Sequence, residues 1–378
     1  MLPAPKPDGL SLADVLQSCL GAIAGEANRL ALPRVNRAIV LLVDGLGADN
    51  LKARAGHART LAGALSPRGV IDSGFPTTTA AAITSLTTGV SPGQHGLVGY
   101  TALDTLNDRI VNQLSGWDDR LDPLSWQLAP TVFETASASE FSSVAIGPER
   151  YRDSGFSRAV LRGANYLAAA SIADRMLLAA EAAREPGPPG LVYVYVPELD
   201  MAAHSHGWQS REWTHALETT DAAAKELASA LGRATGLIVT ADHGVLDVAQ
   251  RSHVLVDSSP ELLDGVRFVA GDPRCLQLHF EPDATAAQRE LIVERWRESE
   301  SDRAWVATRA EAIGALWFGE VLPQVAPRIG DLLIAARKGI AYYDSRSATP
   351  HGRAMVGQHG SWSPAELRIP LLRFGAFA

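Results

Sequence analysis

The 378-residue chain has few cysteines and no long hydrophobic segment. Cys19 and Cys275 are too few for a disulfide framework and do not form the paired spacing of a zinc finger. This scarcity favours a reducing compartment, and we expect a cytoplasmic protein. The apolar run AIVLLV at 38–43 is too short to span a bilayer, and the N-terminus, with its prolines and acids, does not resemble a secretory signal. We therefore expect no membrane partner.

Basic residues are also scarce relative to acidic ones, with 34 Lys and Arg against 42 Asp and Glu and a net charge of -8. This balance argues against a nucleic-acid polymer as the main partner. An anionic substrate would need a local concentration of positive charge. Hydrophobic residues at 46% and charged residues at 20% are typical of a globular protein long enough for a large α/β domain with an appendage.

Short apolar runs that end in polar residues recur along the first 250 residues. Their length and β-branched content predict strands buried on both faces, as in parallel sheets. Alanine-rich stretches at 165–184 and 211–232 predict helices. The alternation predicts a doubly wound α/β fold, with a mostly parallel sheet covered by helices on both faces. The runs are RAIVLLVDG (37–45), SSVAIG (142–147), GLVYVYVPELD (190–200) and GLIVTADHG (236–244).

The alternation of strand-like and helical segments changes after about residue 250. Strand-like pieces (VRFVAG, LQLHF) there mix with a charged helical segment, TAAQRELIVERWRE. We predict an α/β core over 1–250, a smaller inserted lobe over 251–348, and a return to the core over 349–378.

Three of the apolar runs end in aspartate, at Asp44, Asp200 and Asp242. Any one of them could be an ordinary turn residue. Parallel strands bring their carboxyl ends to one edge of the sheet, where ligands gather. Three carboxylates at that edge therefore predict a binding site.

Histidines accompany these carboxylates. His204 follows Asp200 by four residues, which places both on one face of a helical turn. His243 adjoins Asp242 at a turn, and His359 lies between glycines in GQHG. Carboxylate oxygens and imidazole nitrogens are typical ligands of zinc and other divalent transition metals.

The motifs FPTTTAAAITSLTTG (75–89), VDGLG, DMAAH, TADHG and GQHG occur in the order and context found in one enzyme family. The chain resembles the nucleotide pyrophosphatase/phosphodiesterase branch of the alkaline phosphatase superfamily from about residue 38 to residue 360. The resemblance implies an alkaline phosphatase-like fold and two metal ions, expected to be Zn²⁺, with Mn²⁺ or another divalent metal as the alternative. One ion would be held by Asp200, His204 and His359, and the other by Asp44, Asp242 and His243, with a threonine also touching the second.

The resemblance also implies a threonine nucleophile ten residues before Gly89, which is Thr79, and a phosphothreonine intermediate. Thr78 is the alternative if the turn is shifted by one residue. We expect the helix to begin at Ala80, and Thr77 and whichever of Thr78 and Thr79 is not the nucleophile to serve as helix caps. Tyr100 stands where nucleotide-cleaving members carry a phosphate-binding asparagine, and we expect it to contact substrate.

The implied function is a dinuclear metal-dependent phosphodiesterase or nucleotide pyrophosphatase acting on a small phosphate ester. No lysine or arginine occurs between Gly69 and Arg109, so the nucleophile lacks a nearby cationic clamp for a monoester dianion. This favours diesters. The alternatives are a phosphomonoesterase or phosphonate hydrolase on the same metal core, and a catalytically silent metal- or anion-binding protein. The oligomeric state is left open.

Overall fold

The computed structural model describes residues 1–346 and 350–378. Its centre is a six-stranded sheet in the order β18-β8-β1-β7-β5-β6. β1 pairs in parallel with β7 and β8, β5 pairs in parallel with β7 and β6, and only β18 runs antiparallel, against β8. The strands are β1 (Arg37–Val43), β5 (Ser142–Gly147), β6 (Asn165–Ala168), β7 (Gly190–Val196), β8 (Thr235–Thr240) and β18 (Leu372–Gly375).

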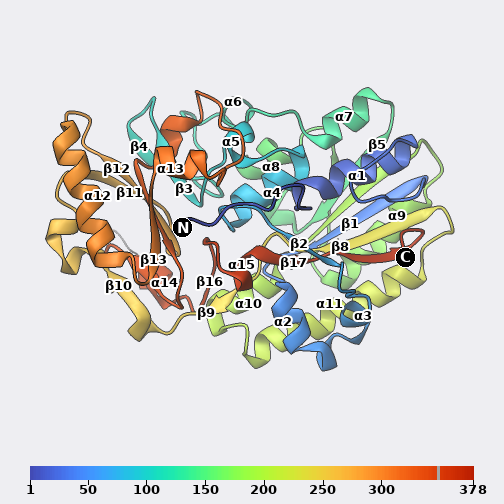
Figure 1. Ribbon diagram of the computed structural model, residues 1–378. Helices are drawn as coiled ribbons and strands as arrows, with labels where there is room; N and C mark the ends of the chain where they lie inside the picture. The colour runs from blue at the N-terminus through green and yellow to red at the C-terminus, as the bar shows by residue number, and fades with distance from the viewer. Residues whose placement is uncertain (347–349) are drawn as a thin grey trace.

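Helices cover both faces of this sheet. In Figure 1, α1 (Ala13–Ala24) and α7 (Val132–Ala138) lie above it, and α10 (Glu198–His206) and α11 (Arg211–Ser229) lie below it. The helix α9 (Ile172–Arg184) packs on the sheet beside α11. The predicted doubly wound, mainly parallel α/β fold is confirmed.

The four predicted apolar runs form β1, β5, β7 and β8, and every residue of β1 is buried. The prediction of one continuous helix over 165–184 is wrong at its start. Residues 165–168 form the edge strand β6, and α9 begins only at Ile172. These four residues pair in parallel with β5, and the hydrogen bonds of this pairing outweigh the helix propensity of the alanines that follow.

A second six-stranded sheet, in the order β13-β14-β12-β11-β3-β4, is antiparallel throughout. The helix α12 (Ala286–Glu300) packs against β13, on the left of Figure 1. The division of the chain at residues 251 and 348 stays a proposal, and the structure adds to this sheet two strands from 101–112. The strands are β3 (Thr101–Asp104), β4 (Arg109–Asn112), β11 (Val266–Asp272), β12 (Cys275–Phe280), β13 (Ala304–Thr308) and β14 (Leu332–Ala336).

A buried ion pair ties the second sheet to the C-terminal segment that returns to the core. Arg274, at the turn between β11 and β12, donates two hydrogen bonds to Glu366, at 3.0 and 2.7 Å, and both side chains are fully buried. Glu366 also accepts from the backbone amide of Ser361 at 3.0 Å. The segment that carries His359 is therefore anchored from the side of the second sheet.

Shorter elements complete the part of the chain that the structure describes, and none of its helices is long and apolar enough to cross a bilayer. Three small two-stranded pairs, β2 with β17, β9 with β16 and β10 with β15, join distant segments. Their bounds are β2 (Val70–Asp72), β9 (Leu246–Asp247), β10 (His253–Leu255), β15 (Ala341–Tyr343), β16 (Gly357–Gln358) and β17 (Arg368–Pro370). The remaining helices are α2 (Ala48–Ala53), α3 (Arg59–Gly63), α4 (Thr79–Thr88), α5 (Pro92–His95), α6 (Pro123–Trp126), α8 (Gly155–Val160), α13 (Arg309–Gly314), α14 (Pro350–Ala354) and α15 (Pro364–Leu367).

Candidate active site

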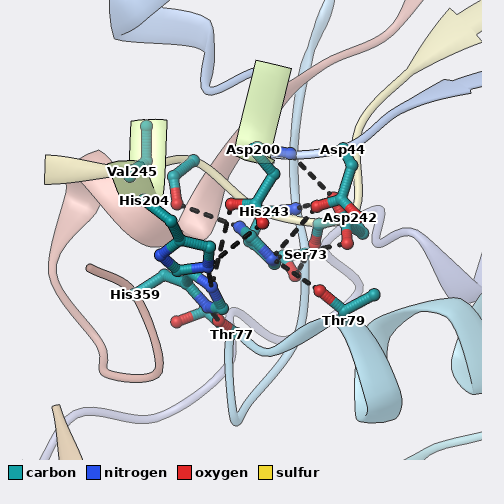
Figure 2. Close-up of polar contacts among 12 residues, drawn as sticks. Asp44, Ser73, Thr77, Thr79, Asp200, His204, Asp242, His243, Val245 and His359 are labelled. Atoms are coloured by element: carbon teal, nitrogen blue, oxygen red, sulfur yellow. Dashed lines mark hydrogen bonds and ion pairs between the residues drawn. The ribbon is translucent and has the colours of Figure 1, made fainter. Parts of the chain in front are cut away.

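The three aspartates meet at the carboxyl edge of the central sheet, as Figure 2 shows. Asp44 directly follows β1, and Asp242 comes shortly after the neighbouring strand β8. Asp200 was expected at a strand end but lies in the first turn of α10, which starts just after β7. Because β7, β1 and β8 are adjacent and parallel, all three carboxylates reach the same place.

Gly45 in the VDGLG motif lets these carboxylates approach one another. Its φ is +72°, and an added Cβ would lie 3.1 Å from the side chain of Asp200. Its backbone amide donates to Oδ1 of Asp242 at 3.1 Å. A glycine after Asp44 therefore provides both the turn and the room that the cluster needs.

Three histidines complete the cluster. Nε2 of His204 lies 3.1 Å from Oδ2 of Asp200 and 3.3 Å from Nε2 of His359. Nε2 of His243 lies 3.5 Å from Oδ1 of Asp44 and 3.4 Å from the nearer oxygen of its neighbour in the chain, and its ring stacks on that of His359 with centroids 3.6 Å apart. All six residues of the two predicted ligand sets are therefore together.

Each of the three rings directs Nε2 into the cluster, because Nδ1 is held by a backbone carbonyl. Nδ1 of His204 donates to the Gly357 carbonyl at 2.8 Å, and Nδ1 of His359 donates to the Thr77 carbonyl at 2.9 Å. Nδ1 of His243 lies 3.2 Å from the carbonyl of the next residue. A carbonyl can only accept, so each Nδ1 carries a proton and each Nε2 faces the cluster, as in histidines that bind a metal through Nε2.

The carboxylates also fit a metal centre. Oδ2 of Asp44 accepts from the Tyr195 hydroxyl, and Oδ1 of Asp242 accepts from two backbone amides. The other oxygens, Oδ1 of Asp44, Oδ1 of Asp200 and Oδ2 of Asp242, are buried without a hydrogen-bond partner among the described residues. Groups such as Asp44, Asp242 and His243 place one ligand atom each within 4.8 Å of the others. Buried carboxylate oxygens of this kind favour a proton or a bound cation.

The electrostatics of the cluster agree with this need. Burial and the neighbouring charges of Asp242 and Asp200 raise the pKa of Asp44 well above its ordinary value. Burial opposes charge on His204, yet Asp200 raises the pKa of that imidazole to about 9. Burial, followed by the charge of a neighbouring imidazole, lowers the pKa of His359 well below its ordinary value. The carboxylates thus attract positive charge that a bound cation would supply in place of protons.

Thr79 faces the metal-binding cluster. Its Oγ1 lies 3.1 Å from Nε2 of His243, and it is the first residue of α4, one position earlier than expected. Thr78 is the N-cap residue but makes no capping hydrogen bond through its side chain. The Thr78 hydroxyl instead hydrogen-bonds to Asp272. Of the two candidate nucleophiles, Thr79 is therefore the one beside a predicted ligand.

Thr77 is not a helix cap, and that expectation is wrong. Its hydroxyl donates to the Ser361 carbonyl at 2.8 Å and accepts from the Gly360 amide at 3.0 Å. Its own carbonyl holds His359. Thr77 therefore connects residues 77–79, called the threonine corner below, to the segment that carries His359.

Tyr100 lies next to the same corner. Its backbone amide donates to Oδ2 of Asp272 at 3.3 Å, and its side chain is exposed. Burial raises the pKa of Asp272 to about 7, although the Tyr100 amide and the Thr78 hydroxyl act in the opposite direction. The substrate contact expected of Tyr100 stays a prediction.

A cavity of about 430 Å³ opens beside Thr79. Aromatic and aliphatic side chains make up most of its walls, and Arg150 is the one charged side chain among the described residues that line it. Tyr195 belongs to both the cavity and the cluster, because its ring lines the wall while its hydroxyl donates to Asp44. The aromatic residues are Trp117, Tyr151, Phe156, Tyr166, Tyr193 and Tyr195.

The model of the family described as type I phosphodiesterase/nucleotide pyrophosphatase matches residues 38–362. The chain belongs to this family. No curated protein sequence matches the chain. Membership supports a metal-dependent hydrolase of the phosphodiesterase or pyrophosphatase type, and the two groups of candidate ligands lie inside the matched range.

Solved structures with the same fold include the ectonucleotide pyrophosphatases/phosphodiesterases 5 of mouse and human. Both structures have a TM-score of 0.68 and are 16% identical in sequence to this chain. Each match covers 89% of this chain, and it covers 88% of the murine protein and 87% of the human protein. An inactive variant of the murine protein in complex with AMP has a TM-score of 0.67 and 16% identity, with 90% and 88% coverage. These similarities establish the alkaline phosphatase-like fold.

Two residues of the site escaped sequence reasoning. Tyr195 lies in the strand sequence VYVYV, between apolar residues. A tyrosine in a buried strand needs a hydrogen-bond acceptor for its hydroxyl, which here is Asp44, and this requirement could have pointed to its role. Asp272 lies at the end of β11, far along the chain from Thr78, whose hydroxyl donates a hydrogen bond to it. No local pattern distinguishes it from an ordinary turn aspartate.

Proposed function

We propose that this family member is a dinuclear metal-dependent phosphodiesterase that acts through Thr79 and prefers diesters to monoesters. The observation that carries the proposal is the arrangement of six ligand side chains, three of them with partnerless carboxylate oxygens, around the Thr79 hydroxyl. The proposed metal is Zn²⁺. One ion would be held by Asp200, His204 and His359, and the other by Asp44, Asp242, His243 and Thr79.

When bound, such ions lower the pKa of a coordinated hydroxyl or water and stabilise the oxygens of an in-line displacement. Oγ1 of Thr79 is the atom that attacks phosphorus. A P–O bond to Thr79 forms as its hydroxyl gives up a proton, the bond to the leaving alcohol breaks, and the alcohol departs with the electron pair and takes up one proton in turn. Water then cleaves the phosphothreonine, which restores the hydroxyl and releases a phosphate monoester.

The N-terminus of α4 suits the incoming phosphoryl group. Because the Thr78 side chain does not cap the helix, the amides of the first turn remain available to phosphoryl oxygens. The positive end of the helix dipole adds to this attraction. Asp44 stays fixed by the Tyr195 hydroxyl, which holds the cluster in place during the reaction.

The aromatic cavity supports the preference for diesters. A diester keeps a second organic group after the first ester bond breaks, and that group needs an apolar or stacking wall. The walls beside Thr79 have this character, and 430 Å³ lies within the range of small-molecule sites. Because an inactive variant of the murine relative binds AMP, we propose a small nucleotide ester as the substrate class.

The test compares bis(p-nitrophenyl) phosphate with p-nitrophenyl phosphate on zinc-loaded and manganese-loaded protein. We expect kcat/KM to be at least about tenfold higher for the diester, which corresponds to about 1.4 kcal/mol of transition-state binding. A preference for the monoester would identify a phosphomonoesterase on the same metal core. Metal binding without hydrolysis of any phosphate or phosphonate ester would identify a silent binding protein.

Localisation in the cytoplasm is also part of the proposal. It is supported by Cys19 and Cys275, which are both buried and unpaired. Such thiols are compatible with a reducing compartment.

A further inference from the structure

Arg150 occupies an unusual position among the arginines near the cavity. It lies in the short 3₁₀ turn Glu149–Tyr151 and is exposed, with no ion pair to any residue in the described ranges 1–346 and 350–378. Arg152, two residues away, is neutralised by Glu149 at 2.8 and 3.0 Å. Arg162 is paired with Glu134 at 3.2 Å. Arg150 is thus the arginine whose charge is available at this cavity.

Two sets of contacts place Arg150 close to the metal-binding cluster. Its Nη2 lies 3.0 Å from Sδ of Met201, the residue that follows Asp200 on α10. Its guanidinium lies 4.8 Å from the ring centroid of Tyr151, whose ring is 5.8 Å from that of Tyr195. The hydroxyl of Tyr195 donates to Asp44. Two aromatic rings therefore separate the guanidinium from a predicted metal ligand.

These contacts leave most of the guanidinium unused. A thioether is a weak acceptor, and a cation–π contact at an exposed site contributes little. A guanidinium has five N–H donors in a fork that matches a carboxylate or phosphate. An exposed, unpaired arginine at the edge of an otherwise uncharged aromatic cavity is suited to an anionic group of the ligand.

The position of Thr79 decides which part of a substrate reaches this arginine. In an in-line displacement the leaving group departs on the side opposite the nucleophile. Thr79 itself lines the cavity, and we assign the cavity to the ester group retained on phosphorus, because that group stays beside Thr79 after the leaving group has departed. Its body would lie along the tyrosine rings and its far end would reach Arg150.

We propose that Arg150 is a specificity-determining residue, which selects diesters whose retained group carries a second anion, a carboxylate or a phosphate. This inference rests on the proposed diesterase function and names the substrate class more closely. It assigns Arg150 no contact with the phosphoryl group that is transferred.

The test uses two substrates that release the same leaving group and differ by one carboxylate, benzyl p-nitrophenyl phosphate and 4-carboxybenzyl p-nitrophenyl phosphate. For the zinc-loaded wild-type protein we expect kcat/KM to be about tenfold higher for the carboxylated diester. In Arg150→Gln this ratio should fall to within about twofold of one. Arg152→Gln is the matched control, because it removes the same charge two residues away and should keep the wild-type ratio. A phosphorylated benzyl group in place of the carboxylated one compares the two anions.

Several results would overturn the inference. They are a wild-type ratio near one, an equal fall in kcat/KM for both substrates in Arg150→Gln, or the same loss of ratio in Arg152→Gln. A selective loss of p-nitrophenyl phosphate hydrolysis in Arg150→Gln would instead make Arg150 a clamp for the transferred phosphoryl group.

A binding measurement separates this inference from the proposed function. If neither diester is hydrolysed by the wild-type protein, the proposed function fails. Calorimetric titration of zinc-loaded Thr79→Ala protein with benzyl phosphate and 4-carboxybenzyl phosphate still tests Arg150. The inference is supported if the Thr79→Ala protein binds the carboxylated compound more tightly and the double variant with Arg150→Gln binds both compounds equally. Equal binding of the two compounds by the Thr79→Ala protein contradicts it.

Discussion

Thr77, Thr78 and Thr79 are consecutive and chemically identical, yet their hydroxyls have three different partners. The Thr77 hydroxyl bonds to the backbone at Ser361, the Thr78 hydroxyl bonds to Asp272, and the Thr79 hydroxyl lies beside Nε2 of His243. The chain turns into α4 at Thr79, and the change from extended to helical backbone sends the side chains in different directions. Of the three hydroxyls, only that of Thr79 lies beside a predicted metal ligand, as the proposed nucleophile requires.

We expect Thr79→Ala to abolish turnover while leaving metal content and fold nearly intact, because the reaction needs an oxygen at this position. Thr78→Ala should lower turnover only about tenfold, since its hydroxyl bonds to Asp272 rather than to substrate. Rapid quench with ³²P-labelled substrate, followed by peptide mapping, should place the label on Thr79. Label on Thr78 would show that the nucleophile is one residue earlier.

The choice between Thr78 and Thr79 also marks the limit of prediction at the residue scale. The motif pattern restricted the proposed nucleophile to Thr78 or Thr79, and the different surroundings of the two hydroxyls favour Thr79. The phenol of Tyr195 and the carboxyl of Asp272 were not predicted, because their roles depend on contacts with Asp44 and Thr78 that no spacing along the chain encodes.

At the scale of elements, the sequence predicted the strands that can be identified from their own composition. The apolar runs that became β1 and β8 are buried at every position, β7 at all but one and β5 at all but two, so composition alone identifies these strands. The strands β6, β3 and β4 were not predicted, because their extended conformation depends on hydrogen bonds to neighbouring strands and not on a local sequence pattern. β3 pairs with β11, whose residues come more than 150 positions later in the chain.

The tie between the threonine corner and the segment 357–361 is another long-range element contact. The Thr77 hydroxyl satisfies the Gly360 amide and the Ser361 carbonyl, and all of these groups are buried. The Thr77 carbonyl holds Nδ1 of His359. A change at Thr77 should therefore affect both stability and the metal ligand.

We expect Thr77→Val to lower the free energy of unfolding by about 2 kcal/mol, because it leaves two buried backbone groups without a partner. It should also weaken zinc binding by His359, since the segment that carries this ring loses its two hydrogen bonds to the Thr77 side chain and can shift relative to the Thr77 carbonyl. Chemical denaturation and competitive zinc titration measure the two effects. Thr77→Ser, which keeps the hydroxyl, should restore both, and a serine variant as impaired as the valine variant would contradict this role.

At the scale of the whole molecule, the candidate ligands come from residues 44 to 359 of the 378-residue chain. Their meeting point was predictable, because adjacent parallel strands end at the same edge. The anchoring of His359 was not, since it depends on Thr77 and on the buried pair of Arg274 and Glu366. A cation bound at this point would join β1, β8, α10 and the C-terminal segment.

We expect purified protein to contain close to two equivalents of zinc and to melt several degrees lower after exhaustive chelation. The physical reason is linkage, because a ligand at about one hundred times its Kd stabilises the folded state by about 2.7 kcal/mol. The three partnerless carboxylate oxygens add to this effect, since they repel one another in the metal-free protein. Calorimetric scans of chelated and zinc-reloaded protein measure the shift, and activity should be lost and regained in parallel.

Asp242→Asn and His359→Ala provide the decisive comparison, one for each predicted ion. Each variant should lose most of the zinc-dependent rise in melting temperature and several orders of magnitude in turnover, while Arg152→Gln should keep both. Identical melting curves with and without zinc, or full activity after chelation, would contradict a metal-dependent site built from these residues. A zinc-dependent rise that survives in both ligand variants would place the ion elsewhere on the molecule.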